Sequence, residues 1–122
     1  MENYSQKELD AALQFISSTI GKCEKMQLKF AEGTSQYSLL QNRIKALHIS
    51  KALMENDINI RMYSQQDLEK ALPPVLSIIH KTEKAQMKYG EGTVQYRQFD
   101  PIISTMYISK AFIENEISKR TQ

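Results

Sequence analysis

An internal repeat constrains this chain more than any other feature of its sequence. When the 122-residue sequence is shifted against itself by 59 residues, positions 4–61 align with positions 63–120 without a gap. Of the 58 aligned positions, 27 are identical, including the Glu-Gly-Thr runs that begin at Glu32 and Glu91. Chance does not produce such agreement, so we expect both halves to adopt one structure.

Each half reads as a helix, a short turn and a second helix. Ser5 stands three residues before Glu8, the spacing of a capping box, and Ser64 with Asp67 forms a weaker copy. After the first cap, apolar residues recur at helical steps, interrupted only by Gln27. These residues are Leu9, Leu13, Ile16, Ile20, Cys23 and Phe30. Gly33 and Gly92 stand where helices end, so each turn is short and its flanking helices are expected to be antiparallel.

The second helix of each half has an unusually wide apolar face. Its seam consists of Tyr37, Leu40, Ile44, Leu47, Met54 and Ile58, matched by Tyr96, Phe99, Ile103, Met106, Ile113 and Ile117. A flanking stripe of Ile49, Ala52 and Leu53 widens it, so this helix needs two neighbours. We therefore predict one all-α domain over residues 1–122. Its expected form is an up-down-up-down four-helix bundle made of two tandem helical hairpins.

Prolines distinguish the second half from the first. Pro73-Pro74 and Asp100-Pro101 fall within helices that have no proline in the first half. Proline lacks the backbone donor and disfavours helical geometry in the residue before it. We expect a kink or break near Pro73-Pro74 and a restart of the last helix near Pro101, with Asp100 as its N-cap.

Composition narrows the class of protein. With 41% hydrophobic and 25% charged residues and a net charge of +2, the chain is expected to fold. The lone Cys23 has no internal disulfide partner, which favours a reducing compartment. The sequence contains neither a signal peptide nor 18 consecutive apolar residues. We expect a cytoplasmic protein that does not enter a membrane.

No set of residues predicts catalysis, a metal or a cofactor. The two histidines, His48 and His80, align with Tyr107 and Gly21, so neither belongs to the shared scaffold. Glu-x-x-His spacing is absent, and one cysteine with one histidine is not a zinc set. The four glycines form no phosphate-binding loop.

Lysine rows at helical spacing are the first candidate binding surface. In the predicted bundle both rows lie at the turn end, close to one arginine from each half. The candidate residues are Lys22, Lys25, Lys29, Arg43, Lys81, Lys84, Lys88 and Arg97. They would attract a nucleic acid or an acidic protein. The alternative is that lysines in a last helical turn only complement the helix dipole, and nearby glutamates dilute the charge.

Four polar residues interrupt the apolar seams at equivalent positions. They are Gln27, Lys51, Gln86 and Lys110. One interpretation places them around a polar pocket or makes them set the register of a partner. The other interpretation is structural, because a lysine can lay its stem on the core and keep its amine in water.

Three functions remain open at this stage. The first is a non-catalytic protein-protein interaction or regulatory module that binds another protein or itself. A homodimer fits this reading, because a single hairpin would have to pair to cover its apolar face. The second is binding of nucleic acid or an acidic partner through the lysine rows. The third is an enzyme or ligand carrier with a pocket at the four seam positions.

Overall fold

Four long helices make up most of the molecule. The computed structural model describes residues 3–121, and all regular structure within that range is helical, which confirms the all-α prediction. The long helices are α1 (Gln6–Gln27), α2 (Ser35–Met54), α3 (Gln65–Gln86) and α5 (Asp100–Arg120). A 3-10 helix, η1 (Ile58–Met62), lies between α2 and α3, and the single-turn α4 (Val94–Arg97) precedes α5.

The ends of the helices follow from local sequence. The Ser5 hydroxyl accepts a hydrogen bond from the Glu8 backbone N–H at 3.1 Å, and the Glu8 carboxylate accepts one from the Ser5 N–H. Ser64 and Asp67 make the same reciprocal pair, which confirms both capping boxes. Gly33 and Gly92 have φ of +88° and +84°, a conformation that favours glycine. Each glycine lies in the turn after the first helix of its half.

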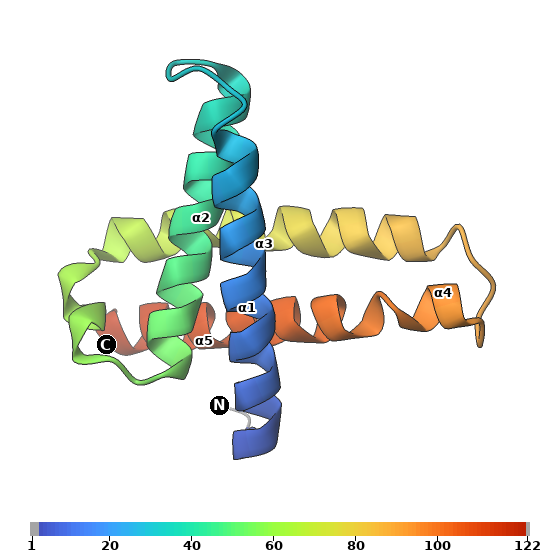
Figure 1. Ribbon diagram of the computed structural model, residues 1–122. Helices are drawn as coiled ribbons and strands as arrows, with labels where there is room; N and C mark the ends of the chain where they lie inside the picture. The colour runs from blue at the N-terminus through green and yellow to red at the C-terminus, as the bar shows by residue number, and fades with distance from the viewer. Residues whose placement is uncertain (1–2, 122) are drawn as a thin grey trace.

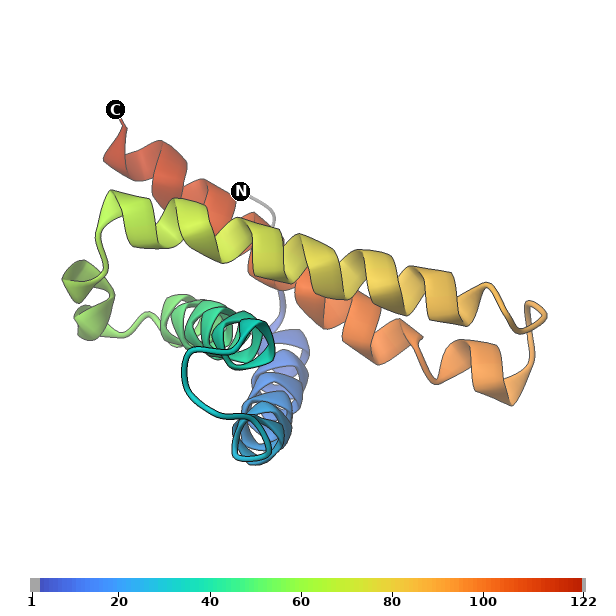
Figure 2. The same ribbon diagram turned by 90° about the horizontal axis from the view of Figure 1, so that it is seen from above.

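The helices are arranged as two pairs that cross. α1 packs along α2, and α3 packs along α5. Figure 1 shows the first pair lying across the second, and Figure 2 shows the same crossing from above. The aligned arrangement of an up-down-up-down bundle is therefore not confirmed. As a consequence, the outer half of each pair projects past the crossing as an arm that ends in a turn.

The core lies where the pairs cross. α2 contacts α1, α3 and α5, in agreement with the two neighbours that its wide apolar face requires. Most buried positions of one half are buried in the other, 59 residues on: Ala12 and Ala71, Ile16 and Val75, Ile20 and Ile79, Leu47 and Met106, Ile49 and Ile108, and Met54 and Ile113. Ser50 and Ser109 are completely buried, and each hydroxyl donates to a carbonyl one turn back in its own helix. These bonds satisfy the two hydroxyl groups inside the core.

The proline pair does not break its helix. α3 runs without interruption from Gln65 to Gln86, with Pro73 and Pro74 inside it (Figure 2). Of the two expected outcomes, the break is therefore wrong, and the kink stays a prediction. Buried Leu68 and Ala71 before the pair and Val75 after it form one continuous apolar seam. Packing of this seam on both sides of the prolines outweighs the local preference to end the helix.

The break before the last helix is confirmed. α4 ends at Arg97 and α5 begins at Asp100, with Pro101 in its first turn. The N-cap is Phe99 rather than Asp100, and it makes no side-chain capping bond. Asp100 instead accepts a hydrogen bond from Gln86 of α3 at 2.8 Å, so its carboxylate serves contact between helices rather than capping.

An arginine fastens the linker between the halves to the end of the chain. The Arg120 guanidinium donates to the Tyr63 carbonyl and, at 2.8 Å, to the Ile60 carbonyl. Its Nε pairs with the Glu116 carboxylate at 3.0 Å. In the first half, residues 55–61 form the linker, whereas their equivalents 114–120 are helical and carry this arginine. The longer α5 thereby connects the end of the second pair to the linker that follows the first pair.

Candidate functional site

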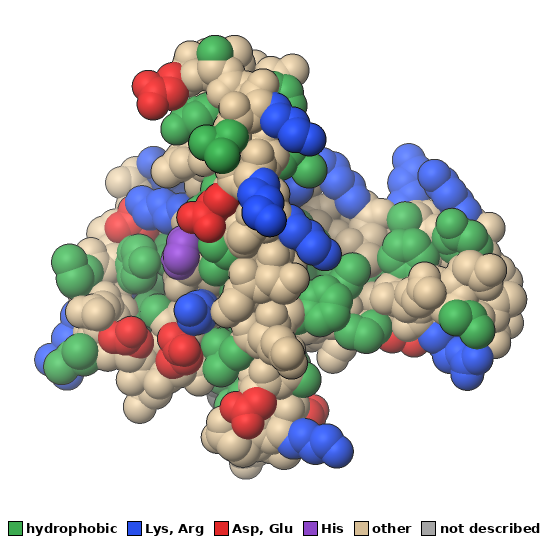
Figure 3. All heavy atoms as spheres, in the orientation of Figure 1, with side chains coloured by type: hydrophobic (Ala, Val, Ile, Leu, Met, Phe, Trp, Pro, Cys, Tyr) green, Lys and Arg blue, Asp and Glu red, His purple; other side chains and the backbone are tan. Residues whose placement is uncertain are grey.

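The two lysine rows lie on different arms. Lys22, Lys25 and Lys29 are exposed at the end of α1, and Lys81, Lys84 and Lys88 are exposed at the end of α3. Because the pairs cross, their turns point in different directions, and the rows do not share one end of the molecule (Figure 1). Figure 3 shows Lys and Arg side chains along the upper part of α1 and along the upper edge of the other arm, facing the open angle between the arms.

The two arginines expected beside these rows differ in environment. Arg97 is exposed on α4, at the second arm. Arg43 is half-buried on α2, and its Nε is buried without a hydrogen-bond partner among the described residues. Burial raises the pKa of the Cys23 thiol above its usual value, and the positive charge of Arg43 acts against this shift. Arg43 therefore faces the interior of its arm more than a surface patch.

The two glutamines tie together the helices of their own pair. Gln27 Nε2 donates to the Tyr37 carbonyl at 3.3 Å and to the Gln41 side chain at 2.7 Å. Gln86 Nε2 donates to the equivalent Tyr96 carbonyl at 2.8 Å and to Asp100 at 2.8 Å. The structure thus assigns both glutamines a polar contact that fixes the outer part of each arm, and it does not bring them into one pocket.

The two seam lysines also lie apart from each other. Lys110 is half-buried on α5 and pairs with Glu114 one turn later, with a nitrogen-oxygen distance of 3.3 Å. Lys51 lines a hollow of about 590 Å³ between α2 and the linker, which we name the linker hollow. Its other lining residues include His48, Glu55, Asp57 and Tyr63.

The described residues contain no group of three or more His, Cys, Asp or Glu side chains that could hold a metal ion. None of the helices within residues 3–121 is long and apolar enough to cross a membrane. Outside the linker hollow, one polar pair stands out: the Tyr107 hydroxyl donates to Glu83 at 3.2 Å, and this bond raises the pKa of Tyr107. The carboxylate thus favours the neutral form of the phenol, and the pair connects α3 with α5.

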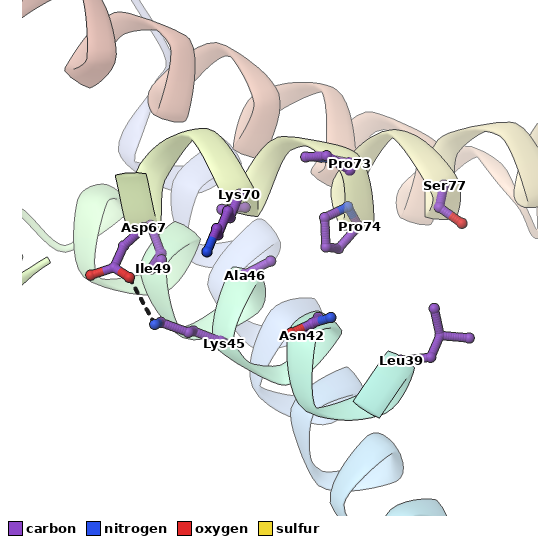
Figure 4. A pocket seen from close by; sticks show the side chains of 11 residues that line it. Leu39, Asn42, Lys45, Ala46, Ile49, Asp67, Lys70, Pro73, Pro74 and Ser77 are labelled. Carbon is purple, nitrogen blue, oxygen red and sulfur yellow. Dashed lines mark hydrogen bonds and ion pairs between the residues drawn. The ribbon is translucent and has the colours of Figure 1, made fainter. Parts of the chain in front are cut away.

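A second depression lies between α2 and the first half of α3, and we name it the α2/α3 hollow. Its volume is about 590 Å³, within the range of ligand-binding cavities. Figure 4 shows its lining residues, which come from both helices. They are Leu39, Asn42, Lys45, Ala46 and Ile49 of α2, and Asp67, Lys70, Ala71, Pro73, Pro74 and Ser77 of α3.

An ion pair separates the two hollows. Lys45 Nζ lies 2.9 Å from an Asp67 carboxylate oxygen, and both residues line both depressions. The bond from Lys45, together with the Ser64 backbone N–H, lowers the pKa of Asp67 to about 2. Asp67 therefore caps α3 and bridges to α2 with a carboxylate that stays charged at all ordinary pH values.

The sequence analysis did not identify the α2/α3 hollow. Its lining residues come from the second helix of the first half and the first helix of the second half, so no local sequence pattern groups them. One signal is visible in the sequence, because Pro73-Pro74 replaces Gln14-Phe15 of the first half, but it predicts a kink or break of the helix and not a hollow. Comparison of the chain with protein-family models, curated proteins and solved structures finds no match.

Proposed function

We propose that this chain is a non-catalytic helical module that binds another protein. The observation that carries the proposal is a pair of exposed apolar side chains at equivalent positions. Leu28 and Met87, which are 59 residues apart, are 86% and 81% exposed at the ends of the two arms. Neither side chain contributes to the core, yet both halves place a large apolar residue there.

Further apolar residues surround each of these positions. Met26 and Leu39 are about half exposed on the first arm, and Tyr89 and Val94 are similarly exposed on the second. Figure 3 shows hydrophobic side chains gathered over the outer part of both arms. Clusters of this kind on a small monomer typically mark contact surfaces, because covering them with a partner removes apolar area from water.

The test compares an arm-tip variant with a matched control. Leu28→Ser/Met87→Ser removes the two apolar side chains, and Lys29→Ser/Lys88→Ser changes their neighbours on the same turns. Chemical cross-linking in native extract, followed by mass spectrometry, is expected to recover a partner with wild type and control but not with the tip variant. Sedimentation velocity detects self-association in the same three proteins. The proposal is contradicted if wild type, control and tip variant all recover the same proteins. It is also contradicted if wild type recovers no partner and sediments as a monomer.

A second candidate function is binding of a polyanion in the angle between the arms. It is supported by the lysine rows, because all six lysines are kept between the halves although Cys23 and Met26 between them become Thr82 and Ala85. This candidate predicts that the protein binds a single-stranded oligonucleotide with an affinity that falls steeply as the salt concentration rises. Changing Lys81, Lys84 and Lys88 to glutamine is expected to abolish this binding. Absence of binding at low salt refutes it.

We further infer that the two crossed pairs are tandem copies of one helical hairpin. The glutamine contacts support this inference, since Gln27 and Gln86 bond to partners that are each displaced by 59 residues. In this view the single chain resembles a two-fold dimer of hairpins, whose arms offer two similar surfaces. We also propose a cytoplasmic setting, which the unpaired, buried Cys23 supports.

A further inference from the structure

Three polar residues of the α2/α3 hollow are not repeated at the equivalent positions of the sequence. Asn42, Lys45 and Lys70 correspond, 59 residues away, to Pro101, Ser104 and Ala11. The buried scaffold residues beside them do repeat, since Ala71 matches Ala12 and Ile49 matches Ile108. The helices of the other half are therefore built without these three side chains, so helix packing does not require them in the hollow.

The proline pair at the wall of the hollow opposes helix stability. Each proline inside a helix costs about 3 kcal/mol relative to alanine. The first half has Gln14-Phe15 at the same place, so the fold does not need prolines there. A locally unfavourable sequence beside a hollow is typical of a functional position. Phe15 is also much larger than Pro74, so the divergence helps to leave this space open.

Three side chains around the hollow are unengaged. Within residues 3–121, Asn42, Lys70 and Ser77 make no side-chain hydrogen bond or ion pair. Figure 4 shows Lys70 extending from α3 toward α2, with Asn42 on the facing helix. Lys45 is already neutralised by Asp67, so Lys70 supplies the one uncompensated charge. Leu39 adds an exposed apolar surface, whereas Ala46, Ile49 and Ala71 form a buried floor.

We propose that the α2/α3 hollow binds an extended peptide segment that carries an acidic side chain. The inference rests on the proposed function and names the segment of the partner. The Asn42 amide both donates to and accepts from a peptide backbone. The Lys70 ammonium binds the carboxylate, while the neighbouring peptide side chain packs on Leu39, the exposed apolar residue of the lining. A single unpaired cation beside Asp67 suits one carboxylate better than a nucleic-acid backbone.

The experiment uses an array of N-acetylated, C-amidated heptapeptides with either Glu or Lys at the centre and varied apolar neighbours. Fluorescently labelled full-length protein is expected to bind Glu-centred peptides in preference to Lys-centred ones. Lys70→Ala introduces the residue of equivalent position 11 and is expected to weaken binding about tenfold or more, the effect of losing one charge-assisted bond. Lys70→Glu is expected to reverse the preference. Lys7→Ala, which changes an exposed lysine at the start of α1 outside both lysine rows and outside the hollow, is the control and leaves binding unchanged.

A second variant tests the space itself. Pro73→Gln/Pro74→Phe restores the sequence of the first half, and it is expected to abolish peptide binding while the protein remains folded. Equal binding of Glu- and Lys-centred peptides, no binding at all, or binding that this variant leaves unchanged overturns the inference. Competition by inorganic phosphate at the same concentration as the peptide also overturns it, because that result indicates a simple anion site. If only the peptide result fails while capture through Leu28 and Met87 persists, the proposed function stands.

Discussion

Replacing Pro73 and Pro74 with alanine is expected to stabilise the protein. Both prolines lie inside α3, more than two turns after its start at Gln65. Each lacks the N–H that would bond to the carbonyl four residues earlier, and its ring crowds that carbonyl. The exposed Pro73 and half-buried Pro74 make few core contacts to lose. The local structure therefore gives a clear direction for the change.

The magnitude follows from helix propensity and from coupling between neighbours. One interior proline costs about 3 kcal/mol relative to alanine. Adjacent prolines share one distortion, so their effects are not additive, and we expect the double variant to gain about 3–5 kcal/mol. That gain is large beside the 5–15 kcal/mol typical of a whole domain. Lost contacts of the Pro74 ring reduce it by about 1 kcal/mol or less.

Urea unfolding followed by circular dichroism at 222 nm measures this change. The midpoint is expected to rise with an unchanged slope, because the surface exposed on unfolding stays the same. Ser77→Ala on the same helix is the control and is expected to change stability by about 0.5 kcal/mol or less. An unchanged or lower midpoint for the double variant refutes the view that the prolines oppose the fold.

Three further changes test the contacts described above. Gln86→Leu is expected to lower the free energy of unfolding by about 1–3 kcal/mol, because a buried amide with two hydrogen bonds is lost. Gln27→Leu is expected to lower it by less, since Gln27 is only half-buried. Equal urea midpoints for the two variants contradict this expectation. The pKa of Asp67 falls to about 2 in the folded protein, below its ordinary value of 3.8, because Lys45 and the Ser64 N–H donate to the carboxylate. The Asp67 carboxylate thus contributes stability above pH 4, and this contribution is lost as the pH falls through 2. The Asp67→Asn variant has no such contribution to lose. Parallel pH profiles of the unfolding midpoint for wild type and Asp67→Asn therefore argue against this role of Asp67. Burial raises the pKa of Cys23, so a thiol reagent at pH 8 should react slowly with the native protein and fast in urea; equal rates would show that the thiol is accessible.

The local structure could be predicted from the sequence because it depends on neighbouring residues. The capping boxes at Ser5 and Ser64 and the turns at Gly33 and Gly92 involve residues three or four positions apart. The width of the apolar face on α2 also correctly indicated that this helix needs more than one neighbour. The repeat then extended each of these conclusions from one half to the other.

The arrangement of the pairs could not be predicted in the same way. An apolar stripe shows which face of a helix is buried, but it does not give the angle at which another helix crosses that face. The angle depends on side chains that meet from distant segments, such as those around Ser50 and Ser109, and on the Arg120 contact with the linker. The separation of the lysine rows and the position of the α2/α3 hollow both follow from the crossing. Sequence reasoning therefore found the lysines but misjudged their common location.

The crossing of the two helix pairs can be measured directly with spin labels at the two arm turns. Glu32 and Glu91 are exposed, equivalent positions in these turns, and Cys23→Thr, which copies Thr82, removes the native thiol. Double electron-electron resonance on the Glu32→Cys/Glu91→Cys protein is expected to give a distance of ~20 Å or more, because two arms of roughly 15 Å, each about half of a 30 Å helix, leave the crossing in different directions. A distance near ~10–15 Å, as in a bundle whose neighbouring helices lie side by side with both turns at one end, contradicts the crossed arrangement.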